Sequence, residues 1–467
     1  MGRLAFRMGD AYDVVVIGAG TGGYSTALRA AQLSQRVALV EKDDRLGGTC
    51  LLRGCIPTKA LLQSAAVMDT VERAADWGVK ASGEPDWSAI VAFEDRAVDK
   101  LVSGVTGLVR QRGIDVLNGA ARLLPGPAVE VGGERVDTTD VVIATGSRPK
   151  LLPGVEITDR ILTSDQALRY DRIPSSAVVI GAGAVGLEFA SLYRSLGAEV
   201  TILEALPSLA PLEDEEISAQ MARAFRKRGI RTAAGASVTS ISTTEGSIDV
   251  TYAVDGRETT VVAEICLVAV GRGPVTDWLR LEEAGVELDE RGFVRVDDLL
   301  RTSAEHVWAV GDVAATPLQL AHVAFTEGIA VAERITGIDV PPIDYTVIPR
   351  VTYSSPEIAS VGLTEAQARA AGEEVAIEKL DLRAIGKANI LGEGGSIKVV
   401  ARRSDGTILG MHMIGPHVTD LIAEGMLITA WEATAADVAA LIHPHPSLSE
   451  GVGEAMLALA GKPLHTV

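Results

Sequence analysis

Cys50 and Cys55, followed by Lys59, are a set of residues that could carry out thiol–disulfide chemistry. In a regular helix, two Cα atoms five positions apart lie about 8.7 Å from each other, whereas a disulfide needs less than about 7 Å. The pair can therefore bridge only if the backbone between them departs from a regular helix, which Gly54 permits. Pro57 is favoured in a first helical turn, so a regular helix is expected from about this residue.

Cys55 would then lie at the N-terminus of that helix, where the helix dipole favours a thiolate. Lys59, one turn later on the same face, adds a positive charge. The alternatives are half of a zinc site or two buried structural thiols. Zinc needs further Cys or His ligands at suitable spacing, and the remaining cysteine, Cys266, lies in an apolar strand, where it is expected to belong to the core.

A second set of candidate residues is the segment LIHPHPSLSE at 441–450. The prolines that follow His443 and His445 favour extended backbone, so the two imidazoles should point to opposite faces. A histidine suits a proton shuttle near neutral pH, and Glu450 could fix its tautomer. On the residues alone other readings stay open, because Ser447 and Glu450 fit a capping box and the histidines fit a stiff loop or a metal pair.

The elements around these residues include a repeated strand–turn–helix–strand unit. Residues 13–41 and 177–204 each run from an apolar strand through a glycine-rich turn and a helix to a second strand that ends in Glu41 or Glu204. In such units the glycines allow the turn, a close approach of the backbone to a pyrophosphate and tight helix packing, and the helix N-terminus holds the anion. Tight packing alone is the alternative. The sequence predicts two dinucleotide sites, with Gly18, Gly20 and Gly23 in the first and Gly181, Gly183 and Gly186 in the second.

Further apolar strands that end in glycine turns are expected at 141–149 and 263–276, where the chain leaves each nucleotide-binding domain. Another strand, within 301–314, ends at Asp312, which would point into the crevice where open α/β sheets bind ligands. From about residue 346 the pattern changes to alternating strands and two helices. We therefore expect an α/β fold with two Rossmann-like domains and an α+β C-terminal domain.

The formal net charge of −19 disfavours nucleic acid as a partner, because binding phosphates requires clustered Lys and Arg. An acidic surface fits a basic protein partner or plain solubility. No apolar run reaches the roughly 18 residues of a membrane span. The leader at 1–10 is too short in its apolar part for a secretory signal, and we expect a disordered tail, with Met8 as an alternative start. The expected compartment is the cytoplasm.

Residues 47–62, GGTCLLRGCIPTKALL, resemble the redox motif of the pyridine nucleotide–disulfide oxidoreductases, most closely that of the dihydrolipoamide dehydrogenases. The resemblance runs from about residue 12 to the C-terminus in the family's order of motifs. It implies FAD and NAD as cofactors, Cys50 as the thiol that exchanges with substrate and Cys55 as the thiol in contact with the flavin. It also implies that His445 is the base, that Glu450 orients it, and that His445 serves Cys50 of the partner subunit in a homodimer.

The resemblance implies further contacts with the cofactors. Lys59 would pair with Glu188 beside the flavin ring, and Asp312 would hold the ribityl–pyrophosphate region of FAD. Glu41 would bind the adenosine ribose of FAD and Glu204 that of NAD. The other residues expected at the cofactors are Lys42, Gly48, Thr49, Ala121, Thr145, Gly146, Ser147, Gly271, Gln319, Leu320, Ala321 and His322. No resident metal is expected.

The same order of motifs implies a division of the chain and a set of partners. Residues 1–150 would be the first part of the FAD-binding domain, 151–271 the NAD-binding domain, 272–345 a central domain that completes the FAD site and 346–467 the dimerisation domain. Besides a second copy of the chain, the expected partners are the lipoyl-bearing acyltransferase of 2-oxoacid dehydrogenase complexes and the H-protein of glycine cleavage.

The sequence departs from the family's pattern at two places. Leu52-Arg53 stands where many relatives carry Asn-Val, and Arg53 could change how substrate approaches. Ser447 replaces a threonine and keeps the hydroxyl.

Glu204 also bears on the choice of coenzyme. It would accept hydrogen bonds from a ribose 2′-hydroxyl and repel a 2′-phosphate, and the following ALPSLAPLEDEE holds no Lys or Arg, so NAD is favoured over NADP. The alternative functions are an NAD(P)H-dependent reductase of another low-mass disulfide, and a diaphorase or quinone reductase. A mainly structural role in a 2-oxoacid dehydrogenase complex is a further reading, and it is compatible with catalysis.

Overall fold

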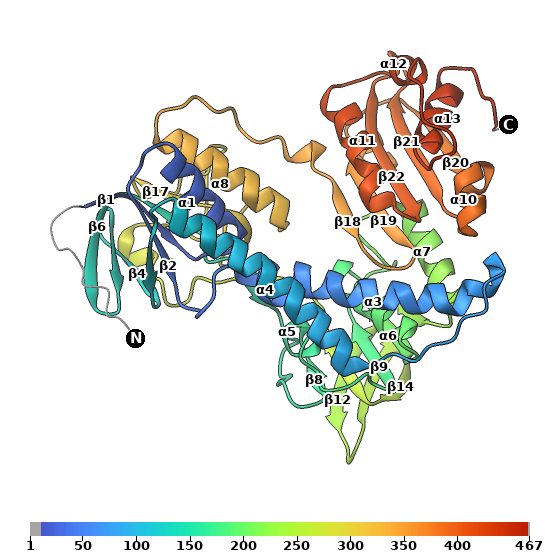
Figure 1. The fold of residues 1–467 in the computed structure, drawn as a ribbon, viewed down its shortest axis with the longest axis horizontal. Helices are drawn as coiled ribbons and strands as arrows, with labels where there is room; N and C mark the ends of the chain where they lie inside the picture. The colour runs from blue at the N-terminus through green and yellow to red at the C-terminus, as the bar shows by residue number, and fades with distance from the viewer. Residues whose placement is uncertain (1–10, 466–467) are drawn as a thin grey trace. The chain divides into compact units, whose positions relative to one another are not determined.

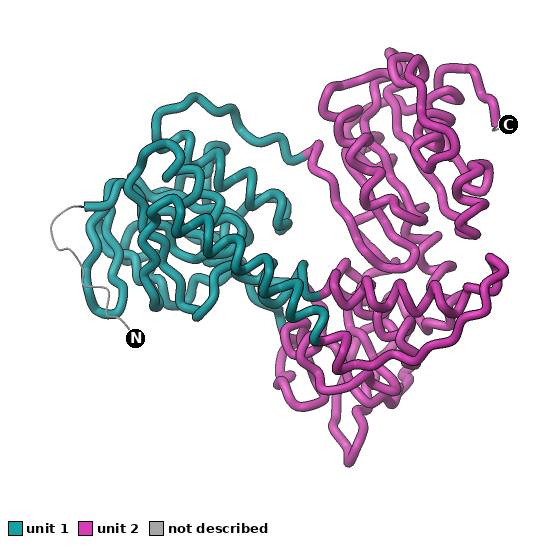
Figure 2. The backbone as a smooth tube through the Cα atoms, viewed as in Figure 1, with its two compact units in different colours: residues 1–57, 92–150, 272–345 teal, residues 58–91, 151–271, 346–467 magenta. Residues whose placement is uncertain are grey.

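The computed structural model describes residues 11–465, shown as a ribbon in Figure 1; the expected leader tail and the alternative start at Met8 lie outside them. The chain forms two compact units, which Figure 2 colours separately. Unit 1 takes the chain up to residue 57 with 92–150 and 272–345, and unit 2 takes 58–91, 151–271 and the chain from 346 onward. Within residues 11–465, none of the helices combines the length and apolar character that crossing a bilayer requires.

Unit 1 is built on a seven-stranded sheet with the order β3-β2-β1-β6-β5-β4, to which β17 is added beside β6. Strands β1, β2, β3, β6 and β17 pair in parallel, and β4, β5 and β6 form an antiparallel meander. A two-stranded ribbon joins β7 to β16. The strands are β1 (Tyr12–Ile17), β2 (Val37–Glu41), β3 (Asp115–Asn118), β4 (Ala121–Leu124), β5 (Ala128–Val131), β6 (Glu134–Ile143), β7 (Ser147–Pro149), β16 (Arg272–Pro274) and β17 (Val307–Ala309).

Both faces of this sheet are covered, which explains the unbroken apolar run of β1. Val14 and Val16 belong to one core cluster, and Val15 and Ile17 belong to another. Helices α1 and α8 lie side by side (Figure 1), so closely that a Cβ on Gly328 of α8 would come within 2.3 Å of the Ser25 hydroxyl oxygen. The helices are α1 (Thr21–Gln32), α2 (Gly48–Arg53), α4 (Trp87–Gln111), which begins in unit 2, and α8 (Ala321–Ile335).

Unit 2 contains a second parallel sheet, in the order β11-β10-β9-β15-β8, and an antiparallel sheet of β12, β13 and β14. The strands are β8 (Ile161–Leu162), β9 (Ser176–Ile180), β10 (Glu199–Glu204), β11 (Arg231–Ala234), β12 (Ser237–Thr243), β13 (Ile248–Val254), β14 (Arg257–Ala263) and β15 (Ile265–Val268). The helices are α3 (Cys55–Arg73), which begins in unit 1, α5 (Ser164–Ala167), α6 (Ala184–Ser195) and α7 (Glu215–Lys227). Cys266 lies in β15, completely buried, as expected of a core residue.

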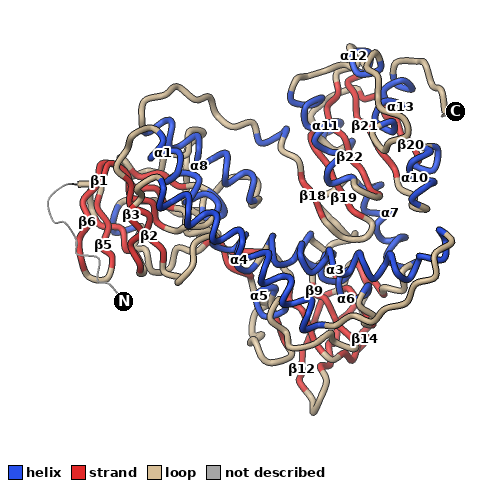
Figure 3. Tube along the Cα trace, viewed as in Figure 1, coloured by secondary structure: helices blue, strands red, loops and turns tan. Residues whose placement is uncertain are grey.

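The C-terminal part of unit 2 is an antiparallel sheet in the order β18-β19-β22-β21-β20, with α11 and α13 packed on it (Figure 3). Its strands are β18 (Arg350–Thr352), β19 (Glu357–Gly362), β20 (Val375–Asp381), β21 (Ser396–Arg402) and β22 (Ile408–Gly415). Its helices are α9 (Glu365–Ala370), α10 (Gly386–Leu391), α11 (Val418–Ala430), α12 (Ala435–Ala439) and α13 (Glu450–Leu459).

The prediction of two helices in this part was wrong, because α9, α10 and α12 have only 6, 6 and 5 residues and so show no sustained helical period. The predicted fold class is confirmed: two parallel sheets with crossover helices precede an α+β C-terminal domain.

Candidate functional site

The two cysteines of the redox segment lie on either side of a break between helices. Helix α2 ends at Arg53, and α3 begins at Cys55, so the predicted departure from a regular helix is confirmed, although α3 begins two residues before Pro57. Gly54 is required at the break, because a Cβ there would lie 2.9 Å from the carbonyl oxygen of Thr49. Cys50 and Cys55 are both partly exposed, and Cys55 occupies the first position of α3.

Helix α2 is held against the first glycine-rich turn. The N–H of Gly47 donates to the carbonyl of Ala19 at 2.9 Å, and a Cβ on Gly48, which has a φ of +56°, would lie 2.5 Å from the Cα of Gly20. Burial raises the pKa of Tyr24 on α1, and the nearby thiols of Cys50 and Cys55 raise it further. The redox segment and the first nucleotide-binding turn therefore form one site in unit 1.

The predicted pair of Lys59 and Glu188 is present in unit 2. Nζ of Lys59 donates to both carboxylate oxygens of Glu188, at 2.9 and 2.8 Å. Tyr353 completes this arrangement, because its N–H donates to Oε1 of Glu188 at 3.0 Å and its ring centroid lies 4.9 Å from Nζ of Lys59. Lys59 lies one turn after Cys55 on α3, and Glu188 and Tyr353 together hold its ammonium group.

The two glycine-rich turns have the geometry that a pyrophosphate requires. Gly18 and Gly181 have φ of +101° and +105°, and a Cβ on Gly23 or Gly186 would lie 1.8 or 1.9 Å from the preceding turn's carbonyl oxygen. Helices α1 and α6 begin without a side-chain cap and without an acidic residue in the first turn. Their N–H groups are therefore available to an anion, and a Cβ on Gly183 would meet nothing within 4 Å.

Glu41 at the end of β2 and Glu204 at the end of β10 are nearly buried, and each faces the glycine-rich turn that precedes it in the chain. Oε2 of Glu41 accepts from the N–H of Ala19 at 2.8 Å, and Oε2 of Glu204 accepts from the N–H of Ala182 at 2.6 Å. The other oxygen of Glu204 accepts from the N–H of Leu206 at 2.9 Å. An ionised carboxylate has about four acceptor positions, so each can still accept from ribose hydroxyls. These residues fit adenosine nucleotides in both units.

Asp312 lies in a polar cluster of unit 1. The hydroxyl of Ser147 donates to Oδ2 of Asp312 at 2.5 Å, and Nε of Arg272 donates to the Ser147 hydroxyl at 2.7 Å. Gln319 donates to the carbonyl of Asp312 at 3.3 Å, and the hydroxyl of Thr145 donates to the carbonyl of Val275 at 2.7 Å. The structure thus brings together Ser147, Asp312 and Gln319, three of the residues expected at FAD, and adds Arg272, whereas Thr145 bonds to Val275.

The remaining residues expected at the cofactors lie as follows. Nζ of Lys42 lies 4.7 Å from the ring centroid of Trp278. The methyl of Ala121 is buried in the core, so only its backbone could face a ligand. Gly146 and Gly271 have positive φ in open turns. Leu320, Ala321 and His322 form the N-terminus of α8, which has no side-chain cap.

The histidines near the C-terminus point in different directions, as predicted. Nδ1 of His445 lies 2.7 Å from Oε1 of Glu450, and its side chain is 76% exposed. His443 is largely buried, with Nε2 2.7 Å from Oε1 of Glu424, and its ring leaves no room for a Cβ on Gly453. Only half of the capping box is present: the N–H of Ser447 donates to Oε2 of Glu450, but the N-cap of α13 is Ser449 and it has no side-chain cap.

The two departures from the family's pattern have local explanations. Arg53 forms an ion pair with Asp43. The hydroxyl of Ser447 donates to the carbonyl of Pro444 at 2.6 Å, while its N–H donates to Oε2 of Glu450 at 2.8 Å. Ser447 therefore fixes the loop that presents His445 and helps to hold the Glu450 carboxylate.

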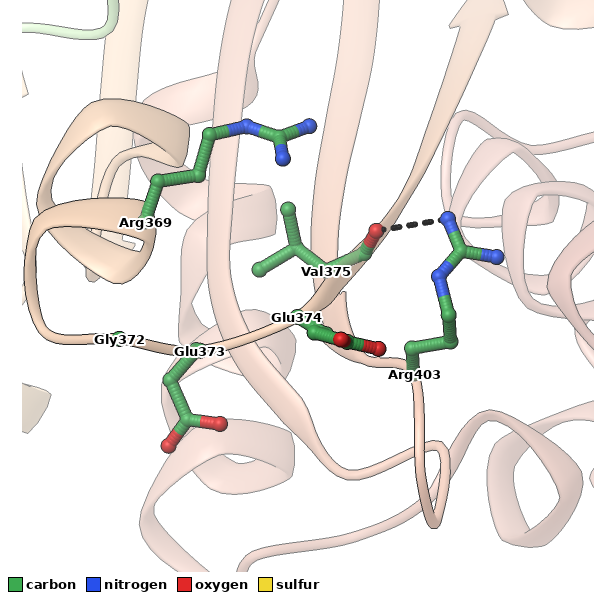
Figure 4. Close-up of a pocket in the computed structure, with 6 residues that line it drawn as sticks. All are labelled: Arg369, Gly372, Glu373, Glu374, Val375 and Arg403. Atoms are coloured by element: carbon green, nitrogen blue, oxygen red, sulfur yellow. Dashed lines mark hydrogen bonds between the residues drawn. The ribbon is translucent and has the colours of Figure 1, made fainter.

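A surface cavity of about 420 Å³ lies elsewhere in unit 2 (Figure 4). Its lining includes none of the residues predicted from the sequence: Arg369, Gly372, Glu373, Glu374, Val375 and Arg403. Arg403 is held by the carbonyl of Val375 at 3.0 Å. Among the described side chains, no group of three or more His, Cys, Asp or Glu could hold a metal ion.

Sequence reasoning missed Tyr24, whose pKa is raised by burial and further by the charges of the two cysteines. It also missed Arg272, Glu327 and Tyr353, which form hydrogen bonds with Ser147, Gly311 and Glu188. Arg272 follows the expected Gly271, so the glycine turn gave a local signal for it. The others lie inside ordinary helical or strand patterns, and no local signal distinguishes them.

Comparisons with known proteins agree with this geometry. A model of the pyridine nucleotide–disulphide oxidoreductases matches residues 12–328, and one of their dimerisation domain matches residues 348–456. A dihydrolipoyl dehydrogenase of Bacillus subtilis is 44% identical over 98% of this chain and 100% of its own length. One of Thermus scotoductus is 42% identical over 97% of this chain and 98% of its own length.

Solved structures agree as well. LpdA from Mycobacterium tuberculosis superposes with a TM-score of 0.88 at 28% identity, over 96% of this chain and 99% of that one. The flavoprotein disulfide reductase RclA from Escherichia coli, solved as a Cu(II) complex, superposes with a TM-score of 0.87 at 27% identity, over 96% of this chain and 100% of that one. With its redox segment, two nucleotide-binding turns and a matching dimerisation domain, this chain belongs to the pyridine nucleotide–disulphide oxidoreductase family.

Proposed function

We propose that this enzyme oxidises protein-bound dihydrolipoamide to lipoamide and reduces NAD⁺, with FAD as its flavin. The observation that carries the proposal is full-length similarity to dihydrolipoyl dehydrogenases, at 44% and 42% identity, in a chain that has both cysteines and the His445–Glu450 pair. FAD supplies the transfer of two electrons from a dithiol to the nicotinamide. The residues of the glycine turns and the Asp312 cluster would hold FAD, and those around Gly183 and Glu204 would hold NAD.

The chemistry of the sulfurs follows from the redox segment. A substrate thiol gives its proton to Nε2 of His445 and attacks Sγ of Cys50 in the Cys50–Cys55 disulfide. The S–S bond breaks, and Cys55 leaves as a thiolate at the start of α3, where the helix dipole and Lys59 stabilise the charge. The second substrate thiol attacks the substrate sulfur of the mixed disulfide, and its proton passes to Sγ of Cys50, so that lipoamide is released and Cys50 leaves as a thiol.

Glu450 acts through His445. Because its Oε1 lies beside Nδ1, the imidazole keeps Nε2 for the substrate proton. In a homodimer, which the dimerisation domain at 348–456 supports, we propose that His445 serves Cys50 of the partner subunit, so that a separated protomer is inactive. Residues 1–150 and 272–345 are proposed to form the FAD-binding part, 151–271 the NAD-binding domain and 346–467 the dimerisation domain.

The proposed partners carry lipoyl groups. They are the acyltransferase of a 2-oxoacid dehydrogenase complex and the H-protein of glycine cleavage. The formal charge of −19 fits docking on a basic surface. The proposed compartment is the cytoplasm.

A steady-state comparison of substrates tests the proposal. Dihydrolipoamide with NAD⁺ should give a kcat/KM at least about a hundredfold above that of oxidised low-mass disulfides with NADPH, since Glu204 disfavours a 2′-phosphate. The reverse preference would favour the reductase alternative. Rapid quinone or dye reduction without lipoamide turnover would favour a diaphorase.

A further inference from the structure

Glu327 of α8 is a completely buried carboxylate in unit 1. Its Oε2 accepts a hydrogen bond from the N–H of Gly311 at 2.6 Å, and its Oε1 accepts one from the hydroxyl of Tyr345 at 2.7 Å. Burial raises the pKa of Glu327, while these donors act in the opposite direction. A buried carboxylate is costly unless donors satisfy it, and here both oxygens have one.

The backbone that Glu327 holds is the turn that carries Asp312. Gly311 precedes Asp312 directly, has a φ of +71° and packs so closely on α8 that a Cβ there would lie 3.3 Å from the Cβ of Ala324. Asp312 in turn accepts from the hydroxyl of Ser147 at 2.5 Å. A displacement of the Gly311 N–H would therefore move Asp312 relative to its cluster.

Tyr345 fixes the other side of Glu327. Burial raises the pKa of its hydroxyl, and the charge of Glu327 raises it further, so the hydroxyl stays protonated and remains a donor at neutral pH. The contact joins residues 18 positions apart, the second of them the last residue of unit 1. The hydrogen bonds thus run from Tyr345 through Glu327 to Gly311.

We propose that Glu327 and Tyr345 are positioning residues for the flavin: Glu327 fixes the Gly311–Asp312 turn, and Tyr345 fixes the carboxylate of Glu327. The inference rests on the proposed function, which assigns Asp312 to FAD. It goes further in making the affinity for FAD depend on two residues that act through the backbone of Gly311 and have no direct part in the sulfur chemistry.

The test compares full-length variants that have been stripped of flavin and titrated with FAD by fluorescence quenching. Glu327→Ala should raise the Kd for FAD about tenfold or more, the effect of losing one hydrogen bond to a charged group. Glu327→Gln keeps an acceptor for the N–H of Gly311 and should stay within about threefold of the parent. Tyr345→Phe removes one hydroxyl, and its Kd for FAD should lie between those of the two Glu327 variants. It still tests the inference if Glu327→Ala does not fold.

Asp140→Ala is the matched control. Asp140 is a nearly buried carboxylate of the same unit, on β6, and it accepts from Nε1 of Trp308 at 2.9 Å. This variant should lower the Tm of the apoprotein while the Kd for FAD stays unchanged. Equal Kd values for the parent, Glu327→Ala and Tyr345→Phe would overturn the inference. So would a rise in the Kd for FAD in Asp140→Ala as large as that in Glu327→Ala. A parent that binds no FAD would instead refute the proposed function.

Discussion

Nδ1 of His445 lies 2.7 Å from Oε1 of Glu450, the imidazole mostly exposed and the carboxylate mostly covered. Burial raises the pKa of Glu450, but hydrogen bonds from the N–H of Ser447 and from His445 outweigh it and hold the pKa below its ordinary value. Glu450 therefore stays ionised at neutral pH and can stabilise the imidazolium that forms when His445 takes a proton.

For His445→Gln we expect a fall in kcat for dihydrolipoamide oxidation of about 10²- to 10⁴-fold, the usual contribution of a general base. FAD should remain bound, as its visible absorbance would show. His443→Gln is the matched control, because His443 also contacts a glutamate but is buried against Gly453. It should lower the Tm and leave kcat within a few-fold. Unchanged turnover in His445→Gln would reduce that residue to a structural role.

Glu204→Ala tests the choice of coenzyme. The variant loses the carboxylate that is proposed to accept from ribose hydroxyls and to repel a 2′-phosphate, so the ratio of kcat/KM for NAD⁺ to that for NADP⁺ should fall by about tenfold or more. The measurement is steady-state turnover with each coenzyme. An unchanged ratio would mean that Glu204 does not contact the adenosine ribose.

Gly183→Ala separates nucleotide binding from folding. A Cβ at this position meets nothing within 4 Å, so the Tm should change by no more than a few degrees, whereas a bound pyrophosphate would meet the new methyl and the affinity for NAD⁺ should fall. In Gly186→Ala, by contrast, the Cβ would lie 1.9 Å from the carbonyl oxygen of Gly181, and the fold itself should lose stability. NAD⁺ affinity equal to the parent's in Gly183→Ala would place the coenzyme elsewhere.

Glu264, which directly precedes β15 in unit 2, leads us to expect a pH dependence of stability. Burial raises its pKa, but hydrogen bonds from Ser175 and Arg172 prevail and lower it to about 2. A carboxylate with a depressed pKa stabilises the fold above its unfolded value, near 4.3, and this contribution is lost as the pH falls towards 2. Glu264→Gln should therefore cost about 1 to 2 kcal/mol at pH 7, because solvent screens these partly exposed contacts, and little near pH 2. Urea unfolding at several pH values measures it; a difference independent of pH would contradict the assignment.

The parts of the fold that could be predicted are those whose sequence pattern lies within one short, contiguous stretch of residues. The glycine turns, Glu41 and Glu204 each belong to one local unit, and Gly54 marks the break between Cys50 and Cys55. The contact of Lys59 with Glu188 joins positions 129 residues apart, and only the resemblance to the family predicted it.

The contacts that could not be predicted depend on packing between distant segments. Ser147 and Asp312 are 165 positions apart. Glu327 lies inside an ordinary helical pattern, and nothing in that pattern indicates that its carboxylate is buried. The same holds for Tyr353, whose backbone meets Glu188 only after the two parts of unit 2 have packed together.

The exchange of electrons through Cys50 is tested most directly by Cys50→Ser, assayed with dihydrolipoamide and NAD⁺ and, separately, for dye reduction by NADH. The substitution removes the sulfur that substrate is proposed to attack and leaves Cys55 and the two glycine-rich turns in place. Lipoamide turnover should be abolished while some NADH-dependent dye reduction persists. Full retention of dihydrolipoamide oxidation in this variant would contradict the account.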